Sequence, residues 1–89
     1  MMRRKAEIPV NQDESLHLRP MQVLNERAMQ FEAELTLTRN GQTVDAKSML
    51  ELTMLAGRTG PLTLEACGPD ADQAVAALSA LLDQELNKG

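Results

Sequence analysis

The alternation of apolar and polar positions changes period several times along the chain, and each change marks a predicted element. Ile8 and Val10 alternate with polar neighbours, which predicts a short strand with one buried face. Pro9 lies between them and has no N–H to donate, so we expect this strand at the edge of a sheet. Residues 1–6, which are rich in Arg and Lys, are expected to form a solvated tail.

A helical period follows this first strand. Leu24, Ala28 and Phe31 recur at the spacing of one helix face. Pro20 is tolerated in a first helical turn, because its missing N–H has no partner to lose there. We therefore expect a helix that begins near His17 and runs towards residue 31.

Two strands joined by a tight turn are predicted next. Leu35 and Leu37 alternate with polar neighbours over residues 33–39, which is the period of a strand. The Asn-Gly pair that follows favours the positive φ angles of a hairpin turn. Val44 and Ala46 continue the alternation beyond that turn, so the second strand lies there.

The remaining sequence predicts a short helix, a fourth strand and a long helix. Ser48 and Glu51 have the spacing of a capping box, and two glycines soon end the helix that they open. Residues 62–66 alternate as a strand, and Asp70 is expected to cap the last helix. The apolar stripe of that helix consists of Ala74, Ala77, Leu78, Leu81 and Leu82.

The order strand, helix, strand, strand, helix, strand, helix predicts an α+β fold. We expect a four-stranded antiparallel sheet covered on one face by three helices, an open-faced two-layer sandwich of βαββαβα order. A chain of 89 residues allows one small domain, and the pattern shows no repeat or linker. We therefore interpret residues 1–89 as a single domain.

Composition and charge exclude several classes of function. With 9 Lys plus Arg against 13 Asp plus Glu, a general nucleic-acid binder is disfavoured. The chain has one Phe, no Trp and no Tyr, so it lacks stacking platforms for bases. One Cys and one His do not make a metal site, and no apolar run is long enough to cross a membrane. We expect a cytoplasmic domain without metal or cofactor.

One candidate for chemistry remains at the start of the first predicted helix. His17 stands there, and a helix start presents unpaired N–H groups and a partial positive charge that suit a phosphate. A neutral imidazole can act as a nucleophile, and the guanidinium of Arg19 can pair with phosphate oxygens. A transiently phosphorylated histidine needs this combination, although by residue type alone a histidine in a surface loop is the commoner interpretation.

Residues 16–20, with the sequence Leu-His-Leu-Arg-Pro, resemble the active-site signature of the HPr family. These proteins are the histidine phosphocarriers of the bacterial phosphoenolpyruvate-dependent phosphotransferase system. Residues 46–48, Ala-Lys-Ser, resemble the second signature of the family, at the entrance to its short middle helix. The strand order, the Asn-Gly hairpin and the turn at Gly68 also fit, so the resemblance covers about residues 7–86.

The resemblance implies a phosphoryl carrier without turnover of its own. His17 would take a phosphoryl group on Nδ1 from phosphorylated enzyme I and hand it to a IIA component. Arg19 would steady the phosphate, and the backbone N–H groups of Leu18 and Arg19 would complete the cradle. No cofactor is implied, and we expect a monomer. Whether the carrier serves sugar transport or the nitrogen-related branch stays open.

Further roles are carried over to the second signature and its surroundings. A dedicated kinase phosphorylates the matching serine in some bacteria, so Ser48 is a candidate for regulatory phosphorylation as well as a helix cap. Lys47 is a candidate for contact with partner proteins. We also predict that Met21, Met49 and Leu50 form an exposed patch for docking, with burial in the core as the alternative.

The chain departs from the family pattern at several positions near the signatures. Ser15 stands where the family usually has Gly, and Leu18 and Met21 replace residues that are commonly small. Glu26 and Glu51 lie where several relatives carry neutral or basic residues, which weakens the expected docking to an acidic enzyme I surface. These differences concern the identity of the partner more than the chemistry.

A function of another class remains as an alternative. A regulatory binding module would act through Ser48 and the patch of Met49 and Leu50, without phosphoryl transfer. A hydrolase or metalloenzyme is disfavoured, because no second catalytic base stands at a recognisable spacing and too few metal ligands are present.

Overall fold

The computed structural model describes residues 2–86, which form four strands and three α-helices. Their order is β1 (Arg3–Ile8), α1 (Leu18–Ala28), β2 (Glu34–Arg39), β3 (Gln42–Asp45), α2 (Met49–Leu52), a 3₁₀ turn η1 (Thr53–Leu55), β4 (Leu62–Cys67) and α3 (Ala71–Leu86). The predicted βαββαβα order is confirmed.

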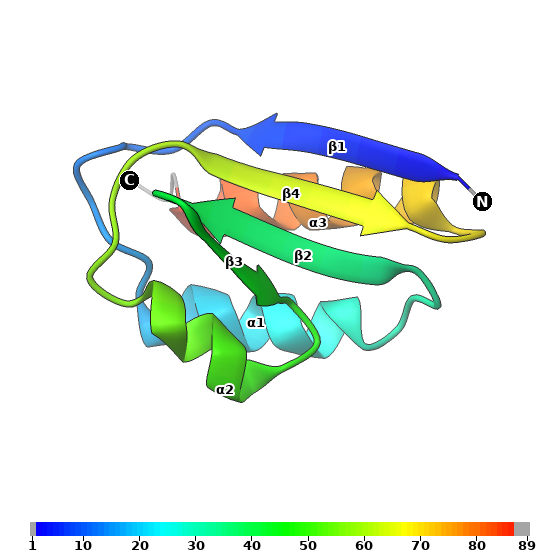
Figure 1. The fold of residues 1–89 in the computed structure, drawn as a ribbon, viewed down its shortest axis with the longest axis horizontal. Helices are drawn as coiled ribbons and strands as arrows, with labels where there is room; N and C mark the ends of the chain where they lie inside the picture. Colours follow the sequence, from blue (N-terminus) through cyan, green and yellow to red (C-terminus); the bar gives the residue numbers. More distant parts are fainter. Residues whose placement is uncertain (1, 87–89) are drawn as a thin grey trace.

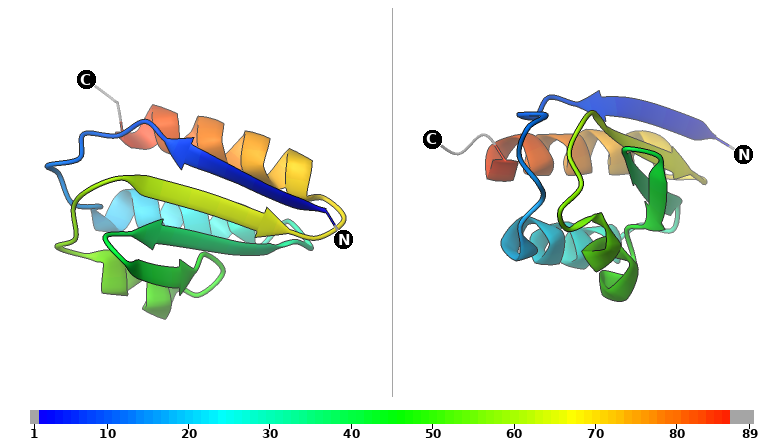
Figure 2. Two further views of the ribbon diagram at one scale, coloured as in Figure 1. Left: turned by 45° about the horizontal axis from the view of Figure 1, so that its top comes forward. Right: turned by 60° about the vertical axis from the view of Figure 1, so that its left-hand side comes forward.

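The strands form one antiparallel sheet in the order β1-β4-β2-β3. All three helices cover the same face, and the other face is left open (Figures 1 and 2). On the inner face of the central strands, Leu37 lies opposite Leu64 and Leu35 lies opposite Ala66. The α+β open-faced sandwich predicted from the sequence is therefore confirmed, and β1 lies at an edge as expected.

The first strand begins earlier than predicted, and the expected solvated tail is wrong. Residues Arg3–Ile8 pair with β4 over its whole length, and Val10 lies beyond the strand. Within β1 only Ile8 is buried, whereas Arg3, Arg4 and Lys5 are exposed. An edge strand with so little buried surface shows no alternation in its sequence, because its backbone hydrogen bonds rather than its side chains hold it.

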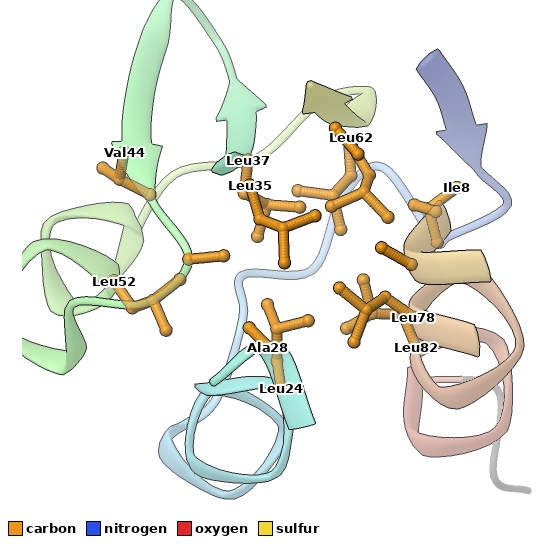
Figure 3. Packing of buried hydrophobic residues seen from close by; sticks show 14 of the residues in the cluster. Ile8, Leu24, Ala28, Leu35, Leu37, Val44, Leu52, Leu62, Leu78 and Leu82 are labelled. Carbon is orange, nitrogen blue, oxygen red and sulfur yellow. The ribbon is translucent and has the colours of Figure 1, made fainter. Parts of the chain in front are cut away.

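The core lies between the sheet and the helices. Leu24 and Ala28 of α1 and Leu78 and Leu82 of α3 point towards the sheet, where they meet its inner face (Figure 3). The inner face of the sheet consists of Ile8, Leu35, Leu37, Val44, Leu62, Leu64 and Ala66. Each of these side chains is at most 2% exposed. Burial of this apolar surface supplies the main force that holds the helices on the sheet.

Two details of the hairpin and of α1 test the sequence pattern. Asn40 and Gly41 have φ angles of 49° and 77°, so the predicted hairpin turn is confirmed. The first helix ends at Ala28, and Phe31 lies in the following loop, half-buried. The N–H of Phe31 donates to the carbonyl of Ala28, which is the tighter bond of a 3₁₀ turn at a helix end.

The last helix starts where predicted, but the side chain of Asp70 before it binds the loop between α1 and β2. Asp70 precedes α3 and its carbonyl accepts from the N–H of Ala74. Its carboxylate accepts from the N–H groups of Glu32 and Ala33, at 2.9 and 2.8 Å. The bond from Glu32 has the largest effect and lowers the pKa of Asp70, and the bond from Ala33 and the positive charge of Lys47 lower it further. Burial of the carboxylate opposes this shift. Asp70 thus fastens the α1–β2 loop to α3.

The apolar stripe of α3 is narrower than predicted. Ala74, Leu78 and Leu82 are fully buried, whereas Ala77 and Leu81 are half-buried at its margin. The stripe also includes Ala71. Through this row of side chains, α3 packs against α1 and against the side of the sheet that β1 and β4 form.

Candidate functional site

His17 occupies the N-cap of α1 with an exposed side chain. Its backbone is extended, with φ −86° and ψ 165°, and its carbonyl accepts from the N–H of Met21. The imidazole makes no capping hydrogen bond. Leu16 before it is buried, and Pro20 three residues later is buried as well. The reactive candidate is therefore presented to solvent between two anchored neighbours.

The first turn of α1 has the donors that a phosphate needs. Leu18 and Arg19 are the first two residues of the helix, so their N–H groups have no acceptor within it. Pro20 follows and has no N–H. The structure thus brings the side chain of His17 and these two backbone donors to one helix end, and the partial positive charge of that end favours an anion.

Arg19 meets a residue that the sequence analysis missed. Its Nε lies 3.8 Å from the carboxylate oxygen Oε1 of Glu85, which stands in the last turn of α3. The side chain of Arg19 is 73% exposed and that of Glu85 only 11%. An ion pair of this exposure is weak, about 0–1 kcal/mol, so Arg19 is held near the helix start without being locked there.

A cleft of about 200 Å³ opens beside His17. It lies between α1, the loop after β1, the end of β2 and the end of α3. Its polar lining consists of Asn11, Glu14, Ser15, His17, Arg39 and Glu85. Neither Arg39 nor Glu85 is signalled by a local motif, because their approach to His17 depends on how distant elements pack.

Ser48 caps α2 as predicted. Its Oγ accepts from the N–H of Glu51 at 3.2 Å. The reciprocal half of the capping box is absent, since the carboxylate of Glu51 accepts instead from the N–H of Asp45 at 3.0 Å. Ser48 is therefore used in the fold, and its hydroxyl is partly exposed at the surface of α2.

The predicted docking residues separate into two groups. The prediction that Met21 belongs to an exposed patch is wrong, because this side chain is 2% exposed and lies in the core. Met49 is half-buried against the core, whereas Leu50 is 81% exposed. Lys47 is engaged within the fold, as its Nζ donates to the carbonyl of Phe31. Leu50 thus remains the most accessible of the four.

Comparison with known proteins places the chain in a family. The family model described as the PTS HPr component phosphorylation site matches residues 4–84. The chain belongs to the HPr family. It is 40% identical over 75 residues to the phosphocarrier protein HPr of Cupriavidus necator, covering 83% of this chain and 84% of that one. The HPr of Vibrio cholerae is 37% identical over 79 residues, covering 88% and 93%.

Solved HPr structures have the same fold. The crystal structure of the phosphocarrier protein HPr from Bacillus anthracis matches with a TM-score of 0.76 at 29% identity, covering 89% of this chain and 95% of that one. The histidine-containing phosphocarrier protein of Mycoplasma matches with a TM-score of 0.77 at 30% identity, covering 99% and 100%. The resemblance drawn from the two HPr signatures is thereby confirmed.

Residues 2–86 contain neither a candidate membrane span nor a candidate metal site. No helix in that range is long and apolar enough to cross a membrane. The same residues contain no group of three or more His, Cys, Asp or Glu side chains that could hold a metal ion.

Proposed function

We propose that this HPr-family chain accepts a phosphoryl group on His17 from phosphorylated enzyme I and passes it to a IIA component. The observation that carries the proposal is the placement of His17 at the N-cap of α1, with an exposed imidazole that makes no capping bond. Family membership over residues 4–84 supports the same chemistry. The chain then acts as a carrier and has no turnover of its own.

In the proposed transfer, Nδ1 of His17 attacks phosphorus, and the bond between phosphorus and the donor atom of enzyme I breaks. The electron pair of that bond returns to the donor atom, and a phosphoramidate forms on His17. The carrier needs little covalent chemistry for this step, because position and charge stabilisation dominate phosphoryl transfer. The backbone N–H groups of Leu18 and Arg19 receive the phosphate oxygens.

Arg19 supplies a mobile positive charge in this scheme. Its weak pairing with Glu85 keeps the guanidinium beside the helix start, and its exposure allows it to turn to the phosphate. The planar guanidinium suits two phosphate oxygens at once. When the phosphoryl group leaves for the IIA component, the ion pair between Arg19 and Glu85 forms again.

The regions around α2 are proposed for docking and regulation. Leu50 is 81% exposed on a short helix that packs against α1, so a partner that reaches His17 can also contact it. Ser48 is proposed as a phosphorylation site whose modification would replace the hydroxyl that now accepts from Glu51. The negative charge of a phosphate there would change how the same face meets a partner.

The exposure of Leu50 also favours the second candidate function, a regulatory binding module. Such a module would bind its partner through Leu50 and Ser48 and would not need His17. Binding that survives in His17→Ala but is lost in Leu50→Glu would support it. Binding that requires phosphorylated His17 would support the carrier instead.

The deciding experiment is phosphorylation by phosphoenolpyruvate and the enzyme I of the same organism. We expect the intact mass of the wild type to increase by one phosphoryl group, in an acid-labile form, and to return when a IIA component is added. His17→Ala should gain nothing while keeping the circular dichroism spectrum of the wild type. An acid-stable phosphate that persists in His17→Ala would contradict the proposal.

A further inference from the structure

A buried arginine stands in the wall of the cleft beside His17. Arg39 is the last residue of β2 and is 2% exposed, and within residues 2–86 no other charged residue is buried. It occupies an inward-facing position of the strand, in line with the core residues Leu35 and Leu37. A charge at a core position is costly unless hydrogen bonds compensate it, so its presence there calls for a reason.

The guanidinium of Arg39 joins two loops that are far apart in the sequence. Its Nε donates to the carbonyl of Gly60 at 2.8 Å, and Nη2 donates to the carbonyl of Asn11 at 3.2 Å. The N–H of Gly60 donates in turn to the carbonyl of Gln12 at 2.7 Å. Three bonds therefore close the loop after β1 onto the loop before β4, and Arg39 makes two of them.

The loop that Arg39 holds is the one that leads to His17. It turns at Asn11, whose carbonyl also accepts from the N–H of Glu14 at 3.2 Å, and its side chain accepts from the N–H of Asp13. From there the chain continues directly to His17 at the start of α1. The bond from Arg39 to Asn11 therefore ties down the segment that leads to His17, in addition to the buried neighbours Leu16 and Pro20.

The charges around the cleft explain why an arginine is useful there. Glu14 and Glu85 line the cleft together with His17, and their carboxylates oppose a phosphate on the imidazole. Arg19 is 73% exposed, so water and salt screen its charge. Arg39 is screened much less, and although burial lowers its pKa, a guanidinium stays protonated.

We propose that Arg39 is a positioning residue for phosphoryl transfer: it fixes the loop that carries His17 and keeps a permanent positive charge in the wall of the cleft that receives the phosphate. This inference rests on the proposed function of His17. It adds a residue that stands outside both HPr signatures and comes from the opposite layer of the fold.

Two variants separate the charge of Arg39 from its geometry. R39M keeps a long apolar side chain but removes the charge and both hydrogen bonds, whereas R39K keeps the charge without the fork of donors. The matched control is R58M. Arg58 is half-buried, and it too donates to a backbone carbonyl, that of Asn40 at 3.2 Å, yet it does not line the cleft.

Three quantities are measured for each variant, well below its melting temperature. They are kcat and KM of enzyme I with the carrier as substrate, and the rate of phosphohistidine hydrolysis. In R39M we expect kcat/KM to fall about 10- to 100-fold, mainly through kcat, because a displacement of about 1 Å at the reacting group can cost that much. We also expect phosphohistidine to hydrolyse faster in R39M, because the positive charge beside the phosphate is lost.

The expected pattern across the set is specific. R39K should keep the wild-type hydrolysis rate but lose part of the transfer rate, and R58M should keep both. Wild-type transfer and hydrolysis rates in a folded R39M, or equal losses of transfer rate in R39M and R58M, would overturn the inference. If R39M does not fold, R39K decides alone: an unchanged transfer rate overturns the inference. In all these cases phosphorylation of wild-type His17 is unaffected, so failure of the proposed function remains distinguishable.

Discussion

Gly68, between β4 and α3, offers a sharp test of how tightly this fold is packed. Its φ angle is +154°, and a Cβ atom placed on it would lie 2.6 Å from Cα of Ala33 and 3.0 Å from its Cβ. Because the nearest atom belongs to the backbone, no rotation of a side chain can relieve the contact. In Gly68→Ala, therefore, the turn must move away from the start of β2.

The expected cost has two parts. A non-glycine residue at positive φ costs about 1–3 kcal/mol, and an overpacked contact costs about 1–3 kcal/mol more. We expect Gly68→Ala to lose roughly 2–6 kcal/mol of unfolding free energy, which is a large share of the stability of a small domain. With an unfolding entropy of about 2.1 cal/mol/K per residue, this lowers the melting temperature by about 10–30 °C.

Urea and thermal unfolding followed by circular dichroism measure this loss. Gly57→Ala is the matched control, because Gly57 has a φ angle of +79° with nothing within 4 Å of an added Cβ. It should lose only the backbone part, about 1–3 kcal/mol. The double variant Gly68→Ala/Ala33→Gly should recover little, since Cα of Ala33 stays in place. Equal losses in Gly68→Ala and Gly57→Ala would refute the reasoning.

Three other predictions concern caps, pH and the core. Ser48→Ala should lose about 1 kcal/mol in urea unfolding, because the N–H of Glu51 loses its acceptor, whereas Ser48→Asn should lose less. The pKa of Asp70 is lower in the folded state than its ordinary value of 3.8, so its ionised carboxylate stabilises the fold at pH values above 3.8. This contribution is lost as the pH falls through the folded-state pKa. Urea unfolding at several pH values should therefore show a steeper acid loss in the wild type than in Asp70→Asn, and parallel curves would contradict this. Met21→Ala should lose about 2–5 kcal/mol and Leu50→Ala less than about 0.5 kcal/mol; similar losses would contradict the burial of Met21.

Much of the fold is predictable because its elements bury one clear face. Leu35 and Leu37 mark β2, and Leu78 and Leu82 mark α3, with the period that each element requires. The pattern fails for β1, where Ile8 alone is buried and the backbone pairing with β4 leaves no trace in the sequence. Edge strands held mainly by backbone bonds are poorly visible to hydrophobic periodicity.

The residues of the candidate site also differ in how far the sequence predicts them. His17 and Arg19 are local to one motif and can be found from it, whereas Arg39 and Glu85 reach the cleft through packing of distant elements. Met21 shows an avoidable error. It stands three residues before Leu24, on the same helix face, so helical spacing itself indicated burial.

The positions of the first and last described elements have a practical consequence for anyone who fuses a label to this protein. Leu86, the last residue of α3, lines the cleft beside His17, so a purification tag or fluorescent protein joined directly after it would start next to the proposed phosphate-accepting site. The strand β1 runs towards the loop that leads to His17, which leaves Arg3 at its far end (Figure 1). Fusions are therefore better placed before β1, where they leave the approach of partner proteins open.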